Sequence, residues 1–296
     1  MSVTTRSADR DHGSHLAARP AAPAETDAWR RFQQAQGFVF DMDGVLYRGD
    51  QPLPGVTEIL DALAIRNRHV MLATNNSMST PESYVAKLSR MGIEVPAEAI
   101  LTSALATRDY LLETLPAEAG IFVIGMPALR EQLFGGTTFR AIQFGEEQPD
   151  AVVLGLDVGF TYDKLKEATA AIRGGAQFIA TNSDATLPTE NGLVPGAGSI
   201  VAAVATASGQ VPLVIGKPET PLLVQSLHRM AVPAHEAVMI GDRLDTDILA
   251  GHRAGMLTVL VLTGVSTREE VSHAAVRPDI VVTDLLALVA AFGTVS

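Results

Sequence analysis

The fold of this chain is decided by one stretch, Gly37-Phe38-Val39-Phe40-Asp41-Met42-Asp43-Gly44-Val45-Leu46. Its first four residues are largely apolar and show no polar alternation, which predicts a strand buried on both faces, as in a parallel sheet covered by helices. Two acids follow directly, although ionised aspartate is almost never buried without a partner or a metal. Ligands of open α/β sheets lie beyond the carboxyl ends of the strands, so the stretch predicts an active site at Asp41 and Asp43.

This stretch alone leaves three interpretations of Asp41 and Asp43 open. Hard oxygen ligands at the tip of a strand suit Mg²⁺. An aspartate can also take a phosphoryl group and form an aspartyl-phosphate. The third interpretation is a turn, because Asp-x-Asp-Gly has the composition of a capped loop. The rest of the chain has to decide among them.

The composition excludes several classes of protein. A chain of 296 residues suggests one large domain or two smaller ones, and its hydrophobic content of 47% supports a sizeable core. The net charge of −11 argues against nucleic-acid binding, which needs a basic footprint. No apolar run approaches the roughly 18 residues that a membrane span needs. Without cysteine, a thiolate metal site and a cysteine nucleophile are also excluded.

Residues 1–34 are expected to form a disordered arm. They include few large apolar residues and no periodic pattern, and small residues and prolines dominate residues 17–24. The arm has no apolar segment of the kind that a secretory signal needs. Its acids argue against an organelle transit peptide, so we expect a cytoplasmic protein.

Apolar strands and amphipathic helices alternate along the rest of the chain, which predicts a doubly wound parallel sheet of the Rossmann-like α/β class. The pattern begins again after about residue 116 and ends near residue 210. We therefore expect a catalytic core domain of residues 35–115 and 211–296, with an α/β cap domain of residues 116–210 inserted into it. The expected strands are 37–40, 69–73, 121–125, 151–155, 177–180, 237–240, 257–262 and 279–282.

Polar side chains follow four strand ends of the predicted core. They are Asp41 and Asp43, then Thr74 and Asn75, then Lys217, and finally Asp242 and Asp247. In a parallel sheet these ends lie at one edge, and each cluster suits phosphoryl transfer, where catalysis is mostly positioning and charge stabilisation. Carboxylates hold Mg²⁺, a hydroxyl and an amide bind phosphate oxygens, and a lysine offsets charge.

The charges of this group require a cation. Four ionised aspartates and one lysine leave a net charge of −3, which repels a phosphate dianion. Two like charges about 4 Å apart repel by about 4 kcal/mol at an effective dielectric constant of about 20. A bound Mg²⁺ removes most of this repulsion, and protonation of one aspartate removes more.

The four motifs resemble, in order, those of the haloacid dehalogenase superfamily of phosphatases. They are Asp41-Met42-Asp43-Gly44, Thr74, Lys217 and Gly241-Asp242-x-x-x-Thr246-Asp247. The resemblance covers roughly residue 38 to the C-terminus. The long insert between the second and third motifs, together with Thr74-Asn75-Asn76-Ser77, is similar to the subgroup with a large α/β cap. That subgroup includes p-nitrophenyl phosphatases, pyridoxal phosphatase, phosphoglycolate phosphatase and glycerol-3-phosphate phosphatases.

The resemblance implies a role for each motif residue. Asp41 would attack phosphorus, and Asp43 would protonate the leaving oxygen and then activate water. The Mg²⁺ ligands would be Asp41, the main-chain carbonyl of Asp43, and Asp242. The substrate-binding residues would be Thr74, Asn75, Asn76 and Lys217, with Leu187 from the cap. Asp247 would orient the site without binding the metal.

The cap loop, residues 181–192, is expected to select the substrate. Pyridoxal phosphatases resemble this loop but have a histidine where Leu187 stands, so the pattern favours phosphoglycolate and glycerol-phosphate phosphatases. We expect a small phosphorylated metabolite, with glycerol 3-phosphate first. The sequence leaves open whether Arg48, Asp184 or Asp245 contacts the substrate.

Two other functions and the state of assembly remain open. A phosphomutase would transfer the phosphoryl group to a second substrate, and a phosphate-sensing module would bind without catalysis. A receiver-like sensor needs neither Asp43 nor a cap, so the sequence favours the phosphatase. By resemblance alone, we also expect a homodimer formed through the cap.

Overall fold

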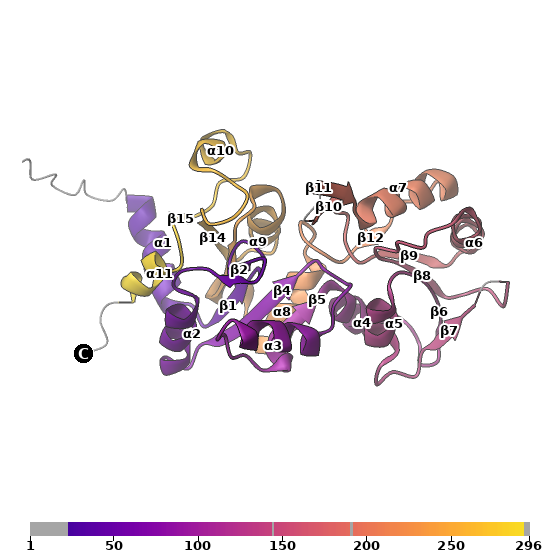
Figure 1. Ribbon diagram of the computed structural model, residues 1–296, viewed down its shortest axis with the longest axis horizontal. Helices are drawn as coiled ribbons and strands as arrows, with labels where there is room; N and C mark the ends of the chain where they lie inside the picture. The colour runs from indigo at the N-terminus through magenta and orange to yellow at the C-terminus, as the bar shows by residue number, and fades with distance from the viewer. Residues whose placement is uncertain (1–22, 144, 190–191, 293–296) are drawn as a thin grey trace, which may run out of the picture.

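The structure, a computed structural model, describes residues 23–143, 145–189 and 192–292. Two lobes lie side by side, each built on a parallel sheet (Figure 1). We call them the core lobe, which contains the N-terminal and C-terminal parts of the described chain, and the cap lobe, which contains the middle. No helix among these residues is long and apolar enough to cross a bilayer.

The sheet of the core lobe has the strand order β15-β14-β13-β1-β4-β5, and all its neighbours are parallel. Strand β1 lies between β13 and β4 in the middle of the sheet, so its carboxyl end lies near the centre of the edge that the strand ends form. The strands are β1 Gly37–Phe40, β4 His69–Thr74, β5 Ile100–Thr102, β13 Ala237–Gly241, β14 Leu257–Val261 and β15 Ile280–Val282.

Both faces of this sheet are covered by helices. Phe38 and Phe40 pack on one side, in an apolar cluster with α2, α3 and α11, whereas Val39 packs on the other side with α4, α8 and α9. This explains why β1 has no polar alternation. The helices are α2 Val56–Ile65, α3 Pro81–Arg90, α4 Ser103–Thr114, α8 Pro221–Met230, α9 Leu249–Arg253, α10 Arg268–His273 and α11 Leu286–Ala291.

The sheet of the cap lobe has the strand order β12-β9-β8-β6-β7 and is also parallel. Helices α6 and α7 cover one face, and α5 lies on the other with α4 of the core lobe. The strands are β6 Gly120–Ile124, β7 Arg140–Ile142, β8 Ala151–Leu154, β9 Gln177–Ala180 and β12 Leu213–Val214. The helices are α5 Pro127–Phe134, α6 Tyr162–Arg173 and α7 Ala197–Ser208.

Three short 3₁₀- or π-helical turns and two antiparallel ribbons complete the described part of the chain. The turns are η1 Ala97–Ala99, η2 Ala234–Glu236 and η3 Leu244–Ile248. One ribbon joins β2 Tyr47–Arg48 to β3 Gln51–Pro52, directly after the Asp41 motif. The other, which we call the cap hairpin, joins β10 Thr186–Thr189 to β11 Gly192–Pro195. It extends from the cap lobe over the space between the lobes (Figure 1).

The prediction of a disordered arm over residues 1–34 is wrong for its last part. Residues Pro23–Gln34 form helix α1. Phe32 is fully buried, and its ring contacts those of Phe38 and Phe292. The prolines and small residues before this helix have the composition of a disordered segment. Trp29 and Phe32, however, lie three residues apart and form an apolar face on the helix. Residues 1–22 lie outside the described part of the chain.

The boundary between the lobes also differs from the expected one. Leu213–Val214 pairs with β9 as the edge strand β12 of the cap sheet, although we expected the core to resume at residue 211. A strand of two residues carries too little hydrophobic pattern to be assigned to either sheet from the sequence. The chain therefore returns to the core lobe only after residue 214, just before Lys217.

Candidate active site

A cavity of about 610 Å³ lies where the carboxyl ends of the core strands face the cap lobe. Asp41, Asp43, Lys217 and the acids after β13 line it from the core side. The cap contributes Leu187 and neighbouring residues from its loop and hairpin. Residues from distant parts of the sequence thus meet at one sheet edge, as the order of strands predicts.

Lys217 is the buried centre of the site. Its side chain is 2% exposed, and its Nζ donates to Asp41 Oδ1 at 2.5 Å and to the main-chain oxygen of Ala73 at 3.2 Å. The same Nζ lies 2.8 Å from Asp247 Oδ1. Burial lowers the pKa of Lys217, but the two carboxylates outweigh this effect and leave the pKa above its usual value. The lysine is therefore charged, as a buried cation with two anionic partners should be.

Asp41 is held in place at the floor of the cavity. The pKa of Asp41 is raised from its usual value of 3.8 to about 7. Burial is the largest cause, the neighbouring carboxylates of Asp247 and Asp242 act in the same direction, and the contact with Lys217 opposes the shift. Without a further cation, this site therefore disfavours the ionised form of Asp41.

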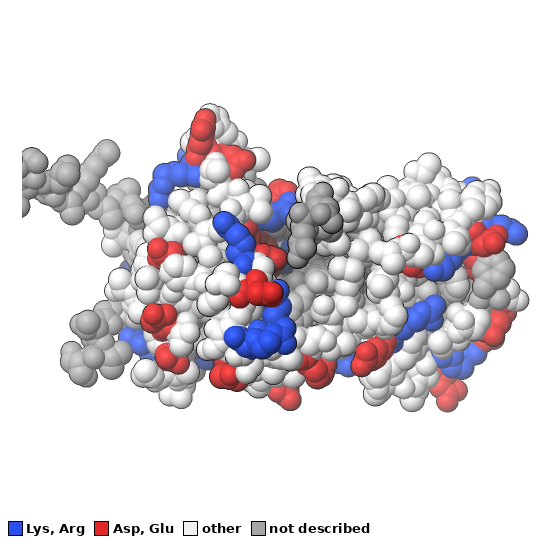
Figure 2. Space-filling view, in the orientation of Figure 1, with Lys and Arg blue, Asp and Glu red and all other residues white. Residues whose placement is uncertain are grey.

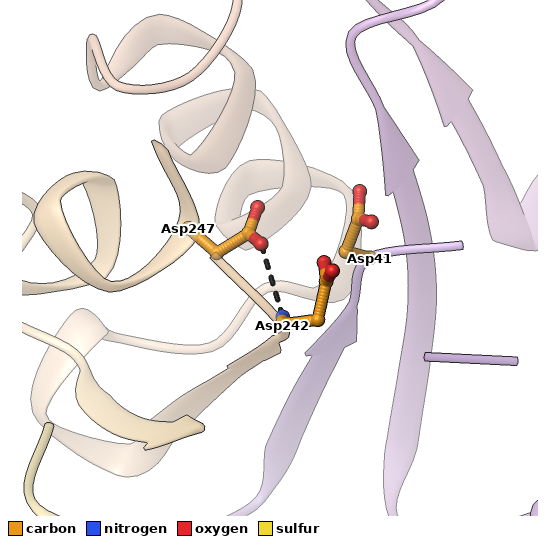
Figure 3. A group of neighbouring side chains, drawn as sticks. All are labelled: Asp41, Asp242 and Asp247. Carbon is orange, nitrogen blue, oxygen red and sulfur yellow. Dashed lines mark hydrogen bonds between the residues drawn. The ribbon is translucent and has the colours of Figure 1, made fainter. Parts of the chain in front are cut away.

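Asp247 and Asp242 have different surroundings, although they come from the same loop. Asp247, on the π-helical turn η3, accepts from the main-chain N–H groups of Asp242 at 3.2 Å and Arg243 at 3.1 Å (Figure 3). Its other oxygen contacts Lys217. Both carboxylate oxygens of Asp247 are thus in use, so its geometry suits orientation of the site.

Asp242 keeps one oxygen free. Its Oδ2 accepts from the main-chain N–H of Val265 at 2.7 Å, but its buried Oδ1 has no hydrogen-bond partner within the described part of the chain. Burial raises the pKa of Asp242 to about 6, and the charge of Asp247 adds to the shift. A buried, unpaired carboxylate oxygen is costly unless a proton or a cation satisfies it.

These carboxylates fit a divalent cation. Ligand atoms of Asp41, Asp242 and Asp247 lie within 4.8 Å of one another. A Cβ atom on Gly44 would lie 2.6 Å from Asp242 Oδ2, and one on Gly264 only 1.9 Å from it. Two glycines therefore leave the space that the Asp242 carboxylate occupies. Carboxylate oxygens, one of which has no hydrogen-bond partner within the described residues, are the kind of ligand that Mg²⁺ prefers.

The end of β4 and the loop after it bring Thr74 and two asparagines to the cavity. Asn75 holds the main chain of Lys217 on both sides, since its Oδ1 accepts from the Lys217 N–H and its Nδ2 donates to the Lys217 carbonyl, each at 2.8 Å. Thr74 Oγ1 accepts from the main-chain N–H of Asn76 at 3.2 Å, and Asn76 Oδ1 accepts from that of Met78 at 2.7 Å. The Asn75 side chain therefore positions Lys217.

The sequence left open whether Arg48, Asp184 or Asp245 contacts the substrate, and the structure places two of these residues in the cavity and the third outside it. Arg48 and Asp184 both line the cavity, and Asp184 lies 3.4 Å from the Asn75 amide. Asp245 is not among the lining residues; its exposed carboxylate instead binds the guanidinium of Arg243 at 2.9 and 3.1 Å.

Sequence reasoning missed several side chains in the cavity wall. The larger polar ones among them are Tyr47, Tyr84, Lys87 and Arg243. Tyr84 and Lys87 lie three residues apart on α3, which is the helix that follows the Thr74 loop. The two side chains therefore share one face of α3. Thr80 followed by Pro81 is the pattern of a helix start, and from that start the spacing of Tyr84 and Lys87 predicts that they share one helical face. In the structure, the Thr80 hydroxyl caps α3 by accepting from the N–H of Ser83.

The fold and the site define a class of protein. A parallel sheet with this aspartate and lysine cluster at its carboxyl edge, joined to an inserted α/β cap, is the arrangement of haloacid dehalogenase-like hydrolases. A family model described by that name matches residues 38–135, and one described as HAD-hydrolase-like matches residues 214–288. The acid sugar phosphatase of Staphylococcus aureus strain USA300 is 39% identical over 246 residues, 83% of this chain and 93% of that protein. The chain belongs to the haloacid dehalogenase-like hydrolase family.

Solved structures agree with this assignment. The 4-nitrophenylphosphatase of Thermotoga maritima superposes with a TM-score of 0.82 at 37% identity, covering 88% of this chain and 99% of that one. The glycerol phosphate phosphatase of Mycobacterium tuberculosis, in complex with magnesium, gives 0.79 at 35% identity and covers 87% and 77%. The predicted fold, a Rossmann-like core with an inserted α/β cap, is confirmed, and the chain is a phosphoric monoester hydrolase.

Proposed function

We propose that this chain is a Mg²⁺-dependent phosphatase that hydrolyses a small phosphorylated metabolite through an aspartyl-phosphate on Asp41. One observation carries the proposal. The Asp41 carboxylate lies at the floor of the cavity, bound by the buried Lys217 and beside the unpaired oxygen of Asp242. This arrangement supplies a fixed nucleophile in Asp41, a positive charge in Lys217 and carboxylate oxygens that can bind a metal cation.

The proposed reaction has two steps. A carboxylate oxygen of Asp41 forms a bond to phosphorus while the ester bond breaks, and Asp43 donates a proton to the leaving oxygen. A water molecule then attacks the phosphorus of the aspartyl-phosphate, gives a proton to Asp43 and releases Asp41. Burial raises the pKa of Asp43, against the opposing charges of Lys87 and Arg48, which supports its role as an acid. Lys217 offsets the negative charge of Asp41 and of the phosphoryl group.

The proposed Mg²⁺ ligands are the carboxylates of Asp41 and Asp242 and the main-chain carbonyl of Asp43. When bound, the ion would offset the clustered negative charge and bind a phosphate oxygen. Thr74, with the main chain around Asn75 and Asn76, is proposed to bind the other phosphate oxygens. Magnesium in the Mycobacterium tuberculosis structure supports the choice of metal.

We propose glycerol 3-phosphate and phosphoglycolate as the first substrates to test. The cap-loop pattern around Leu187 supports both, and glycerol phosphate is named for the Mycobacterium tuberculosis protein. Phosphorylated metabolites are charged and do not cross membranes unaided, which supports a cytoplasmic location. Dimerisation through the cap remains a proposal that light scattering at several concentrations can test.

A phosphate-release screen over a panel of phosphorylated metabolites tests the proposed function. The wild-type protein should release phosphate with Mg²⁺, and chelation with EDTA should abolish release until Mg²⁺ is restored. Asp41→Asn keeps the side-chain volume and removes the attacking charge, so turnover should fall to near background in a folded protein. Asp61→Asn, on the exposed face of α2, is the matched control and should stay active. Substantial activity in folded Asp41→Asn would falsify the covalent mechanism.

A further inference from the structure

Two cations that line the cavity form no ion pair among the described residues. Lys87 and Arg48 both line it, yet neither takes part in an ion pair within 4.0 Å among the described residues. The other cations of the cavity are paired, Lys217 with Asp41 and Asp247, and Arg243 with Asp245. In the middle of the face shown in Figure 2, lysine and arginine side chains lie together with acidic side chains on the core-lobe side of the junction between the lobes.

Neutral partners hold both cations in place. The Nζ of Lys87 lies 4.0 Å from the ring centroid of Tyr47, a residue that is 3% exposed. The guanidinium of Arg48 donates to the main-chain oxygen of Thr263. A cation–π contact and a carbonyl contact restrict a cation without cancelling its charge. The two positive charges therefore remain available to an anion inside the cavity.

Their position matches that of the leaving group. Tyr47 pairs with Asp43, the proposed donor to the leaving oxygen, in a β-bridge; Lys87 lies over the Tyr47 ring, and Arg48 follows Tyr47 in the chain, so both cations lie on the Asp43 side of the cavity. Lys217 lies instead beside Asp41, where the phosphoryl group is attacked.

We propose that Lys87 and Arg48 form a second anion-binding subsite, which selects phosphomonoesters whose leaving group carries a carboxylate or similar anion close to the ester oxygen. The proposal rests on the proposed function and narrows its substrate class. It ranks phosphorylated hydroxy acids above phosphorylated polyols, the reverse of the order that the cap-loop pattern suggests. Charge-assisted contacts in a partly closed cavity are stronger than those at an open surface, which gives the subsite its selectivity.

A matched pair of substrates tests the subsite. 3-Phosphoglycerate and glycerol 3-phosphate share their phosphorylated carbon chain, but the first has a carboxylate where the second has a hydroxymethyl group. The wild-type protein should prefer 3-phosphoglycerate by about tenfold or more in kcat/KM. Lys87→Met keeps the apolar stem over Tyr47 and removes the charge, so it should reduce this preference about tenfold, mainly through KM for the acid.

Three further variants separate charge from structure. Lys87→Arg keeps the charge and should retain most of the preference, whereas Arg48→Gln should reduce it independently of Lys87. Arg90→Gln removes an exposed cation from the same helix, outside the cavity lining, and should leave the preference as in the wild type. The melting temperature of each variant shows that it is folded.

The outcomes distinguish this inference from the proposed function. A wild type that hydrolyses p-nitrophenyl phosphate but shows no preference for the acid overturns the subsite and leaves the phosphatase standing. The subsite is also overturned if Lys87→Met lowers both substrates equally, because a role in holding the phosphoryl group or the fold predicts that result. If no phosphate is released from any of the three substrates with Mg²⁺, the proposed function fails, and the subsite fails with it.

Discussion

Lys217 carries one buried positive charge among three clustered carboxylates, those of Asp41, Asp242 and Asp247. One cation cannot balance three anions. Burial, with the neighbouring carboxylates adding to it, raises the pKa of Asp41 to about 7 and that of Asp242 to about 6. Two main-chain N–H groups and Lys217 contact both oxygens of Asp247, whereas Asp242 Oδ1 has no hydrogen-bond partner within the described residues. At the residue scale, the site is therefore built for a second cation.

This imbalance predicts a pH-dependent effect of Mg²⁺ on stability. The pKa values of Asp41 and Asp242 are raised on folding from 3.8, so their contribution to stability is fully present below about pH 3.8 and is lost as the pH rises to about 7. Bound Mg²⁺ stabilises the ionised forms. Saturating Mg²⁺ should therefore raise the melting temperature by roughly 5 °C at about pH 7.5, and by clearly less at about pH 5.

Differential scanning calorimetry with and without EDTA measures this effect. Asp242→Asn removes the unpaired oxygen and should abolish most of the gain, whereas Asp61→Asn should keep it. An equal gain from Mg²⁺ at the two pH values would contradict the assignment of these carboxylates as ligands.

At the scale of elements, helix α1 closes one side of the core lobe. Its Phe32 contacts Phe38 of β1 and Phe292 beyond α11, which joins both ends of the described chain to the central strand. The Gln33 side chain adds a hydrogen bond of 2.6 Å to the main chain of Ala291. The helix is thus part of the hydrophobic core, because it fills a gap that the sheet and the other helices leave.

Truncation of Phe32 should destabilise the protein strongly. Phe32→Ala removes a fully buried ring and should lower the free energy of unfolding by about 3 kcal/mol, through lost burial and the cavity that remains. Urea denaturation measures the change. Arg31→Ala, next to it on the exposed side of α1, is the control and should change stability little. If Phe32→Ala were as stable as Arg31→Ala, the docking of α1 would be wrong.

At the scale of the whole molecule, the two lobes share one apolar cluster and one cavity. The cluster runs from Val39 and Met71 of the core sheet through α4 to Ile121 and Val153 of the cap sheet. The cavity lies beside this joint, with the motif residues on the core side and the cap hairpin on the other. We therefore expect the motif residues of the core to bind the phosphoryl group, which all substrates share, and Leu187 of the cap to contact the leaving group.

This division of labour predicts the effect of a change at Leu187. Leu187→His replaces an apolar contact in the cavity by an imidazole, so kcat/KM for the physiological substrate should change by roughly 10- to 200-fold relative to that for p-nitrophenyl phosphate. Both substrates are measured on the same variant. Leu193→His is the matched control, because Leu193 lies on the other strand of the cap hairpin, is 70% exposed and is outside the cavity lining. Parallel changes for both substrates would show that Leu187 does not select the leaving group.

Much of the fold was predictable because its strands are buried on both faces. Continuous apolar runs such as 37–40 and 237–240 leave few alternatives to a parallel sheet, and Thr80-Pro81 has the pattern of a helix start, where α3 begins. Some of the elements that were missed have weak local signals. Strands β5 and β7 have three residues each, and α1 is identified only by the partners of Trp29 and Phe32.

The sequence by itself determined the class of the protein, its α/β order and the polar residues at the strand ends, because a parallel sheet brings the carboxyl ends of its strands to one edge. Only the tertiary structure decided what each side chain does there. Asp242 keeps a free oxygen while Asp247 does not, Asn75 holds the main chain of Lys217, and Lys87 lies over Tyr47 with no acidic partner within 4.0 Å among the described residues. These differences depend on contacts between residues far apart in the chain, and local sequence patterns carry no information about such contacts.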